Sequence, residues 1–311
     1  MRCKVGVAEG NELFLYSFPS PHPFNSGRVM PFYDELRKAQ IRTESLRPRL
    51  STRDQLALFH TEEHIRYVEL ASRAGRGFLD QGDTPAFRGI FEAARYAVGS
   101  TTLAVERVAR GELDHAFNPS GGLHHARRDS SAGFCVFNDI GVSVEVLRRQ
   151  RTRRILYVDI DAHHGDGVYY SYESDPRVFI FDIHEDGRYL YPGTGSADEN
   201  GKGKGAGTKV NVPLVPGSGD GEVFAQLPRL EELAKQAKPQ FIIFQCGADG
   251  LEGDPLAGLR YSTEAHRRVG DLLHKLSHEF CDGRMVALGG GGYVPANCAA
   301  AWTAVVSSMC G

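Results

Sequence analysis

Short apolar runs rich in β-branched and aromatic residues recur along this chain, and several of them are continuous rather than alternating. They occupy residues 3–8, 155–160, 178–183, 241–245 and 285–288. A continuous apolar run is typical of a parallel strand whose two faces are both covered. Helical spacings lie between these runs, which predicts an α/β fold with a parallel sheet and helices on both of its faces.

The spacings that predict helices occur in five places. Two follow three- and four-residue steps, from Ile90 to Val108 and from Val269 to Phe280. Three more helices are expected at residues 138–149, 222–237 and 296–307. No repeat or linker interrupts them, and the Gly/Lys-rich stretch 200–207 reads as a loop that lacks the order of a P-loop. Residues 1–311 are therefore expected to form one domain.

Composition and charge narrow the class of protein. The 311 residues are 41% hydrophobic and 24% charged, which is ordinary for a globular enzyme, and the net charge of −3 gives no footprint for nucleic acid. No apolar run approaches the ~20 residues that span a bilayer, so no membrane partner is expected. Six scattered cysteines without a CxxC pair favour reduced thiols in a cytoplasmic protein, with Cys135 and Cys246 buried, and argue against a zinc site built from cysteines.

Polar residues follow the apolar runs at the points where the strands are expected to end. They are Asp161 and His163, Asp182 and His184, Asp249, and the run GGGGY at 289–293. The carboxyl ends of parallel strands are where such sheets place their sites. A functional site is therefore predicted at that edge of the sheet.

Three of these side chains form a candidate metal site. Residues two apart at a strand end share a face, so Asp161 and His163 can point into one pocket. Asp249, in a glycine-flanked turn, supplies a third ligand, although alone it would read as a turn or helix-cap residue. Carboxylate oxygens and neutral imidazole nitrogens are normal zinc ligands, and three of them leave a position open for water and a substrate carbonyl.

The adjacent His124 and His125 are candidate acid–base groups. Asp159 and Asp166 are left over from the ligand segment, and a carboxylate behind each imidazole would fix its tautomer and raise its basicity. One imidazole can then take a proton from a metal-bound water. The alternative is two structural histidines with local backbone bonds.

Tyr293 closes the run of four glycines, where the backbone can adopt positive φ and approach another group closely. Its hydroxyl can then reach a carbonyl oxygen that a metal polarises. Without the metal site, a tight strand-to-helix connection with Tyr293 packed on the core is the simpler interpretation.

Together these segments resemble the metal-dependent histone deacetylase superfamily, which includes bacterial acetoin-utilisation and acetylpolyamine amidohydrolase relatives. The resemblance lies in GGLHHA (121–126), GFC (133–135), ND (138–139), DIDAHHGDG (159–167), PGTG (192–195), CGAD (246–249) and GGGGY (289–293). These motifs occur in the family order, from about residue 20 to residue 295. The resemblance implies a single arginase/deacetylase-type α/β domain with a central eight-stranded parallel sheet.

The resemblance also implies which residues bind metal ions. Asp161, His163 and Asp249 would bind Zn²⁺ or Fe²⁺. Family members bind structural monovalent cations as well, which makes a K⁺ site plausible here. That site would be formed by Asp159, Asp161, His163, Asp182 and Ile183.

Carried over to the catalytic positions, the resemblance makes His125 the general base, with Asp166 behind it. His124, with Asp159 behind it, would assist electrostatically and in protonation of the leaving group. Tyr293 would hydrogen-bond the substrate carbonyl and then the tetrahedral oxyanion.

The resemblance further implies an acyl-lysine channel. Phe134, preceded by Gly133, and Tyr191 match the aromatic pair that lines it, although the second wall is commonly Phe. Asp83 matches the rim aspartate that binds the substrate backbone. Arg28 matches, more loosely, an internal arginine near the acetate exit.

The predicted reaction is amide hydrolysis of an N-acetylated amine, foremost ε-acetyl-lysine of a protein or peptide, with release of acetate. An acetylpolyamine deacetylase would use the same chemistry, but the position that can carry its carboxylate gatekeeper is Leu256.

An arginase-like two-manganese hydrolase would need Asp-x-His-x-Asp, whereas Gly165 follows His164 here. A non-catalytic acyl-ligand-binding regulatory protein is an alternative of another class, and it would have no need of Tyr293. Self-association into a homo-oligomer also stays open.

Overall fold

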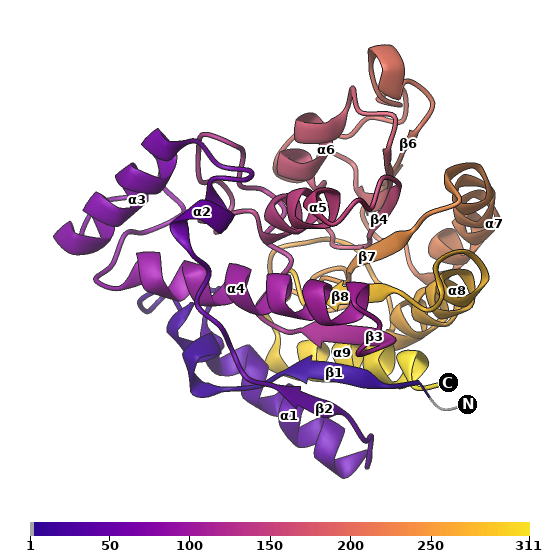
Figure 1. Cartoon of the computed structure of the whole chain (residues 1–311), viewed down its shortest axis with the longest axis horizontal. Coiled ribbons are helices and arrows are strands. Elements are labelled where there is room, and N and C mark those ends of the chain that lie inside the picture. The colour runs from indigo at the N-terminus through magenta and orange to yellow at the C-terminus, as the bar shows by residue number, and fades with distance from the viewer. Residues whose placement is uncertain (1–2) are drawn as a thin grey trace.

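The structure is a computed structural model that describes residues 3–311. Within these residues, eight strands form one all-parallel sheet in the order β2-β1-β3-β8-β7-β4-β5-β6 (Figure 1). The strands are β1 Val5–Ala8, β2 Glu44–Leu46, β3 His115–Asn118, β4 Ile155–Asp159, β5 Val178–Glu185, β6 Lys209–Leu214, β7 Phe241–Gln245 and β8 Met285–Leu288. The predicted α/β fold and its eight-stranded parallel sheet are thereby confirmed.

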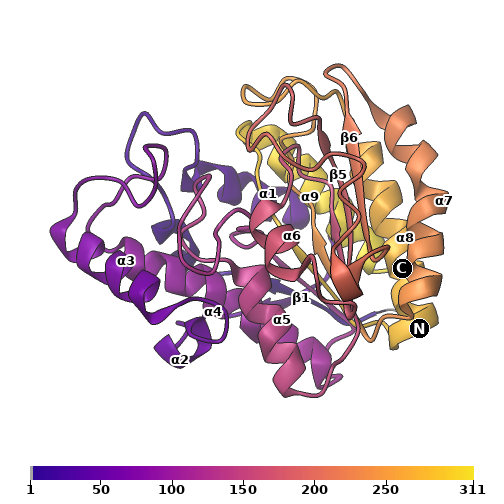
Figure 2. The ribbon, with the colours of Figure 1, turned by 90° about the horizontal axis from the view of Figure 1, so that it is seen from above.

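Helices cover both faces of the sheet. Figure 2 shows α7, α8 and α9 on one side of the strands and α4 and α5 on the other. The helices are α1 Val29–Lys38, α2 Arg53–Leu56, α3 Glu62–Ala74, α4 Ile90–Ala109, α5 Asp139–Arg149, α6 Asp166–Tyr172, α7 Asp220–Ala237, α8 Thr263–Cys281 and α9 Pro295–Met309. The five predicted helices are all present, and their ends agree with the prediction within two residues except at the start of α8, which begins six residues before Val269.

The apolar runs form two cores because each strand buries both of its faces. On β4, Leu156 and Val158 pack into the core that includes residues of α1, α7, α8 and α9. Ile155 and Tyr157, which point to the opposite face, pack into the core formed with α4 and α5. The continuous apolar run is therefore explained by burial on both sides.

Three strands were not predicted from the sequence, and each lacks a long apolar run. β2 is a three-residue edge strand with Glu44 and Ser45 exposed. β3 has polar residues at both ends, and β6 begins with a buried lysine, Lys209, whose Nζ donates to three oxygen atoms. Asp182 and His184 lie within β5 rather than after it, because this strand extends to residue 185.

The strand order determines where the functional loops meet. β3, β8, β7, β4 and β5 are consecutive neighbours in the sheet, although they are far apart in the sequence. Since all strands are parallel, the segments that follow these five strands emerge side by side at one edge. In the part of the chain that is described, no helix has the length and apolar character needed to cross a membrane.

Close packing of α4 against the segment before α2 gives a test of this fold. Gly99 faces the backbone of residues 49–51, and a Cβ atom there would lie 1.9 Å from the Arg49 carbonyl oxygen. The contact is reinforced by Arg95, whose Nε donates to the Ser51 carbonyl at 2.7 Å.

We expect Gly99→Ala to lower the free energy of unfolding by about 1–3 kcal/mol, because the added methyl group overpacks a backbone contact. The matched control is Gly221→Ala in the first turn of α7, where an added Cβ meets no atom within 4 Å. Urea unfolding of both variants measures the difference. Equal stability of the two variants would contradict the close approach.

Candidate metal centre and catalytic pocket

Three predicted ligands converge at the carboxyl ends of two neighbouring strands. Asp161 and His163 follow β4, and Asp249 follows β7, its partner in the sheet. His163 Nδ1 lies 3.1 Å from Asp161 Oδ1 and 3.0 Å from Asp249 Oδ2. All three side chains are buried, and one potential ligand atom from each lies within 4.8 Å of the others. The structure therefore brings together the residues that the sequence selected.

The carboxylates are oriented by hydrogen bonds to their outer oxygens. Asp161 Oδ2 accepts hydrogen bonds from the Gly291 N–H and from Gln245 Nε2, both at 2.7 Å. Asp249 Oδ1 accepts one from the Ala162 N–H at 2.8 Å. Each carboxylate thus directs its other oxygen at His163. Sequence reasoning missed Gln245, whose signal was a polar residue at the end of an apolar strand.

Two glycines give the carboxylates the space that they occupy. A Cβ at Gly247 would lie 2.0 Å from Asp161 Oδ2, and a Cβ at Gly291 would lie 2.0 Å from Asp249 Oδ2. Any side chain at these positions would displace a carboxylate. The glycine-rich turns after β7 and β8 are therefore part of the site's construction.

The two buried carboxylates of this cluster favour the binding of a cation. Burial alone would lower the pKa of His163, but hydrogen bonds and charge from Asp161 and Asp249 raise it to about 10. Two buried carboxylates beside one imidazole thus attract positive charge strongly. Two carboxylate oxygens and an imidazole nitrogen also form a ligand set that suits zinc and other divalent transition metals. The residues present fit such an ion.

His124 and His125 lie beside this cluster, each with a carboxylate behind it. His124 Nδ1 lies 2.8 Å from Asp159 Oδ2, and His125 Nδ1 lies 2.8 Å from Asp166 Oδ1. The two Nε2 atoms are 3.1 Å apart. Two bare lone pairs at this distance would repel, so the contact requires a proton on one of the two nitrogens. The pair can therefore hold one proton at the pocket.

The surroundings of the two histidines differ. Burial and the neighbouring His124 lower the pKa of His125 to about 4, so this ring is neutral near pH 7. Burial opposes ionisation of Asp166, but His125 and Arg127 lower its pKa. Arg127 Nη2 donates to Asp166 Oδ2 at 3.1 Å. A neutral imidazole backed by an ionised carboxylate is a competent proton acceptor.

Hydrogen bonds with Asp139 and Arg28 hold the backbone loops that carry these groups. Asp139, the first residue of α5, accepts hydrogen bonds from the N–H groups of Gly122 and Leu123, which precede the histidine pair. The buried Arg28 donates to the carbonyl oxygens of Gly290 at 2.7 Å and Gly292 at 3.0 Å. Arg28 thus lies against the loop that leads to Tyr293. The role near an acetate exit that the family resemblance implies for Arg28 stays a prediction.

Tyr293 faces the same pocket as the histidines and the metal ligands. A small chamber of about 20 Å³ is lined by Tyr293, His124, His125, Asp161 and His163, among others. That volume is enough for about one water molecule or a small group. Burial, together with the charges of Asp249 and Asp161, raises the pKa of Tyr293, so its hydroxyl keeps its proton.

A channel leads outward from the chamber. Its volume is about 210 Å³, and its lining includes Phe134, Tyr191 and Leu256. Gly133 and Asp83 also line it, together with His125, His163, Leu190 and Tyr293. The channel shares four lining residues with the chamber. All the predicted substrate-binding residues therefore lie at one passage.

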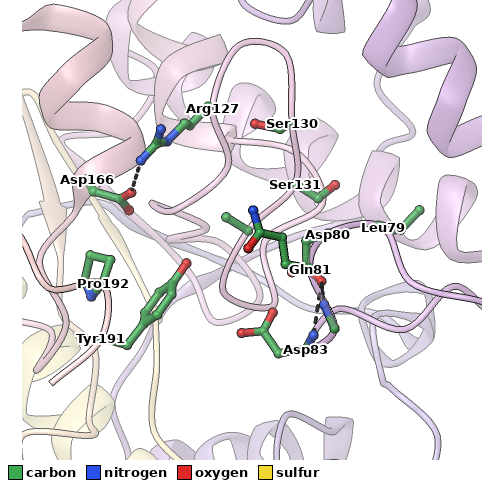
Figure 3. A pocket seen from close by; sticks show the side chains of 12 residues that line it. Leu79, Asp80, Gln81, Asp83, Arg127, Ser130, Ser131, Asp166, Tyr191 and Pro192 are labelled. Atoms are coloured by element: carbon green, nitrogen blue, oxygen red, sulfur yellow. Dashed lines mark hydrogen bonds and ion pairs between the residues drawn. The ribbon is translucent and has the colours of Figure 1, made fainter.

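A wider vestibule of about 530 Å³ shares Asp83 and Tyr191 with the channel. Figure 3 shows the Arg127–Asp166 pair, Tyr191 and Asp83 around it. Burial and the neighbouring Asp80 raise the pKa of Asp83 to about 7. The chamber, the channel and the vestibule thus form a path that widens from a polar inner end to the surface.

Two residues of the predicted K⁺ site lie on neighbouring strands. Asp159 and Asp182 are register partners on β4 and β5. Asp182 hydrogen-bonds the Gly165 N–H at 2.9 Å and His184 Nδ1 at 2.7 Å. The K⁺ site stays a prediction.

Comparison with known proteins adds independent findings. The family model described as "Histone deacetylase domain" matches residues 22–309. The chain is 40% identical over 289 residues to the acetoin utilization protein AcuC of Bacillus subtilis (strain 168), covering 89% of this chain and 74% of that protein. It is 32% identical over 305 residues to AcuC of Staphylococcus xylosus, covering 94% and 79% of the two chains.

Two solved structures have the same fold. The crystal structure of the HDA15 HD domain superposes with a TM-score of 0.91 at 29% identity, covering 99% of this chain and 88% of that chain. The crystal structure of an HDAC homolog complexed with SAHA superposes with a TM-score of 0.86 at 32% identity, covering 98% and 84%. The shared architecture extends over nearly the whole chain.

We expect Asp249→Asn to remove one equivalent of bound Co²⁺ per chain, because the amide keeps the shape of the side chain but removes the charge that binds the cation. The matched control is Asp254→Asn, a nearby buried carboxylate that accepts a hydrogen bond from the Tyr293 N–H at 2.8 Å. Equilibrium dialysis followed by elemental analysis gives the count. The same count in both variants would show that Asp249 is not a ligand.

Proposed function

The chain belongs to the histone deacetylase family, and from this premise we propose that it is a zinc-dependent amidohydrolase that removes acetyl or other acyl groups from the ε-amine of lysine in proteins or peptides. The observation that carries the proposal is the buried cluster of Asp161, His163 and Asp249 beside a carboxylate-backed histidine pair, at the inner end of a narrow channel. We propose that residues 1–311 act as one catalytic domain.

Asp161, His163 and Asp249 would bind the ion, with Zn²⁺ as the first candidate and Fe²⁺ as the second. Such an ion supplies Lewis-acid chemistry, because it polarises a carbonyl group and makes water more acidic. The chain's own residues then have to orient the substrate, accept a proton and stabilise developing charge.

His125 is the proposed general base. Its Nδ1 is engaged by Asp166, so Nε2, which neighbours His124 Nε2, would be the nitrogen that accepts a proton from the attacking water. Arg127 supports the negative charge of Asp166, so the imidazolium formed by proton transfer would be stabilised. His124 is backed by Asp159, and its Nε2 lies 3.1 Å from His125 Nε2. His124 would therefore assist in delivering a proton to the leaving amine.

Tyr293 is the proposed oxyanion donor. Its pKa is raised, so the hydroxyl stays protonated and can donate to the substrate oxygen as negative charge develops there. The loop 289–293 supports this role because Arg28 and Asp254 both hydrogen-bond its backbone. Asp161 and Asp249 would disfavour a tyrosinate in the same place.

The channel supports a lysine side chain as the substrate's stem. Phe134, Tyr191 and Leu256 provide apolar surface for its methylene groups. Asp83 at the outer end is placed to accept a hydrogen bond from a substrate backbone N–H. An acetylpolyamine would instead bring its free ammonium group near Leu256, which has no charge to pair with it.

Buried Cys135 and Cys246 fit a reducing, cytoplasmic environment. A structural K⁺ near Asp159 and Asp182 and a homo-oligomeric state remain part of the proposal.

We expect Tyr293→Phe to lower kcat by about 10²–10³-fold, since one well-placed oxyanion donor is removed. KM and the number of bound metal ions should change little. Steady-state acetate release from an acetyl-lysine peptide measures this. Tyr189→Phe, a largely exposed tyrosine close to the channel in sequence, is the matched control and should keep full activity. Undiminished kcat in Tyr293→Phe would remove this hydroxyl from the mechanism.

We expect kcat/KM for an acetyl-lysine peptide to exceed that for N-acetylputrescine by about tenfold or more, because the channel wall at Leu256 is apolar. Leu256→Glu should shift this ratio toward acetylputrescine by adding a carboxylate for its free ammonium group. Parallel assays at equal enzyme concentration give both ratios. A wild-type preference for acetylputrescine would identify a polyamine deacetylase, whereas no activity on either substrate would favour a non-catalytic acyl-binding protein.

A further inference from the structure

A second group of metal-binding side chains lies at the opposite edge of the sheet, where the strands begin. Cys3 precedes β1, and His115 is the first residue of β3. His274 and His278 are one turn apart on α8, so they lie on the same face of that helix. β1 and β3 begin on the side of the molecule where α8 lies (Figure 1). We call these four residues the Cys3 cluster.

The potential ligand atoms of the Cys3 cluster are close together. Cys3 Sγ lies 3.3 Å from His278 Nε2, and His115 Nε2 lies 3.0 Å from His274 Nδ1. One potential ligand atom from each of the four residues lies within 4.8 Å of the others. Ligands of tetrahedral zinc, at about 2.0 Å for nitrogen and 2.3 Å for sulfur, are separated by roughly 3.3–3.6 Å. Small side-chain rotations would therefore bring the four atoms to that geometry.

The side chains of the cluster face one another inside the protein. His115 is fully buried, and its Nε2 is the ring nitrogen that faces His274. The rings of His115, His274 and His278 contact one another, with centroids 4.7–5.4 Å apart. A neutral imidazole has one bare nitrogen lone pair, and a thiolate has lone pairs on sulfur, so these four neighbouring groups can each offer one donor atom to a cation.

The cluster is partly shielded from water and lies beside a negative charge. His115 is buried, Cys3 and His274 are partly buried, and His278 is exposed. Asp114 adds a negative charge nearby, since its carboxylate accepts a hydrogen bond from the Lys4 N–H at 2.7 Å.

We propose that Cys3, His115, His274 and His278 bind Zn²⁺ in a closed, four-ligand structural site. The set contains sulfur and nitrogen without a carboxylate, which suits zinc and its neighbours among the transition metals and excludes Mg²⁺ and Ca²⁺. Four protein ligands leave no open coordination position for a substrate. The ion would instead join the start of β1, the start of β3 and the end of α8.

This site shares no residue with the catalytic pocket, and it lies at the other edge of the sheet. Its presence or absence therefore does not depend on the deacetylase proposal. It also differs from the cysteine-built zinc site that the scattered cysteines argued against, because three of its four ligands are histidines.

Cobalt spectroscopy tests the proposal on the reduced full-length chain without a polyhistidine tag. The background is Asp161→Asn/Asp249→Asn, in which the catalytic cation site is disabled. We expect this background to bind one equivalent of Co²⁺ with a thiolate-to-cobalt charge-transfer band. Adding Cys3→Ser should abolish the band, and adding His278→Ala should weaken binding by more than about tenfold.

Two control variants in the same background keep the assignment specific. Cys281→Ser removes a neighbouring thiol on α8 that is not in the cluster, and Glu279→Ala alters an exposed position next to His278. Both should retain the charge-transfer band. Zn²⁺ at saturation should raise the Tm of the background by roughly 4–8 °C, and this shift should be lost with Cys3→Ser.

If the double variant does not fold, the wild-type chain gives the same readout, because of the two groups of potential ligands found in residues 3–311 only the Cys3 cluster contains a cysteine. A thiolate–cobalt band that disappears with Cys3→Ser and survives Cys281→Ser supports the site. The absence of that band from folded, cobalt-saturated wild-type protein overturns it, whatever the deacetylase activity proves to be. A band that survives Cys3→Ser would also overturn it.

Discussion

The catalytic pocket depends on how the buried charge of Asp161 and Asp249 is balanced. A buried carboxylate without a partner costs several kcal/mol, and here two of them face one imidazole. The hydrogen bonds from Gln245, the Gly291 N–H and the Ala162 N–H orient these carboxylates, but the donors are neutral and leave the charge in place. A cation bound by Asp161, His163 and Asp249 would complete the balance. The glycines after β7 and β8 make room for the two carboxylates, and Gln245 at the polar end of β7 orients Asp161.

The strand order turns that local requirement into a catalytic arrangement. β3 and β4 follow one another in the sequence, but β8 and β7 lie between them in the sheet. As a result the histidine pair after β3, the Tyr293 loop after β8, Asp249 after β7 and the ligand segment after β4 become neighbours. A sheet whose strands were ordered as in the sequence would separate these segments. The site therefore exists because of a topological switch in the middle of the sheet, where α/β folds commonly place ligands.

Much of this was predictable because the strands that carry the metal ligands are buried on both faces. The runs that became β4 and β7 are continuously apolar, so the polar residues that follow them stood out. β3 was missed because His115 and Asn118 interrupt its apolar character, and their polarity is explained only by distant contacts with His274 and Thr101. The supporting roles of Gln245, Asp139 and Arg127 could not be predicted for the same reason: each depends on a partner that only the folded chain brings near.

The two candidate metal sites differ in donor chemistry, and the difference matches the roles proposed for them. The catalytic cluster is rich in carboxylates and has three ligands beside a chamber, so it can bind a strongly polarising ion and still admit a substrate. The Cys3 cluster contains no carboxylate and offers four ligands, so it can only hold segments together. α8 connects the two: His266, near its start, lies 2.8 Å from the Gly247 carbonyl oxygen in the turn that leads to Asp249, whereas His274 and His278 lie near its end. Burial lowers the pKa of His266, so this contact is a neutral N–H donating to the carbonyl. An ion that fixes the end of α8 would therefore stabilise the same rigid helix that supports a catalytic ligand at the opposite edge of the sheet.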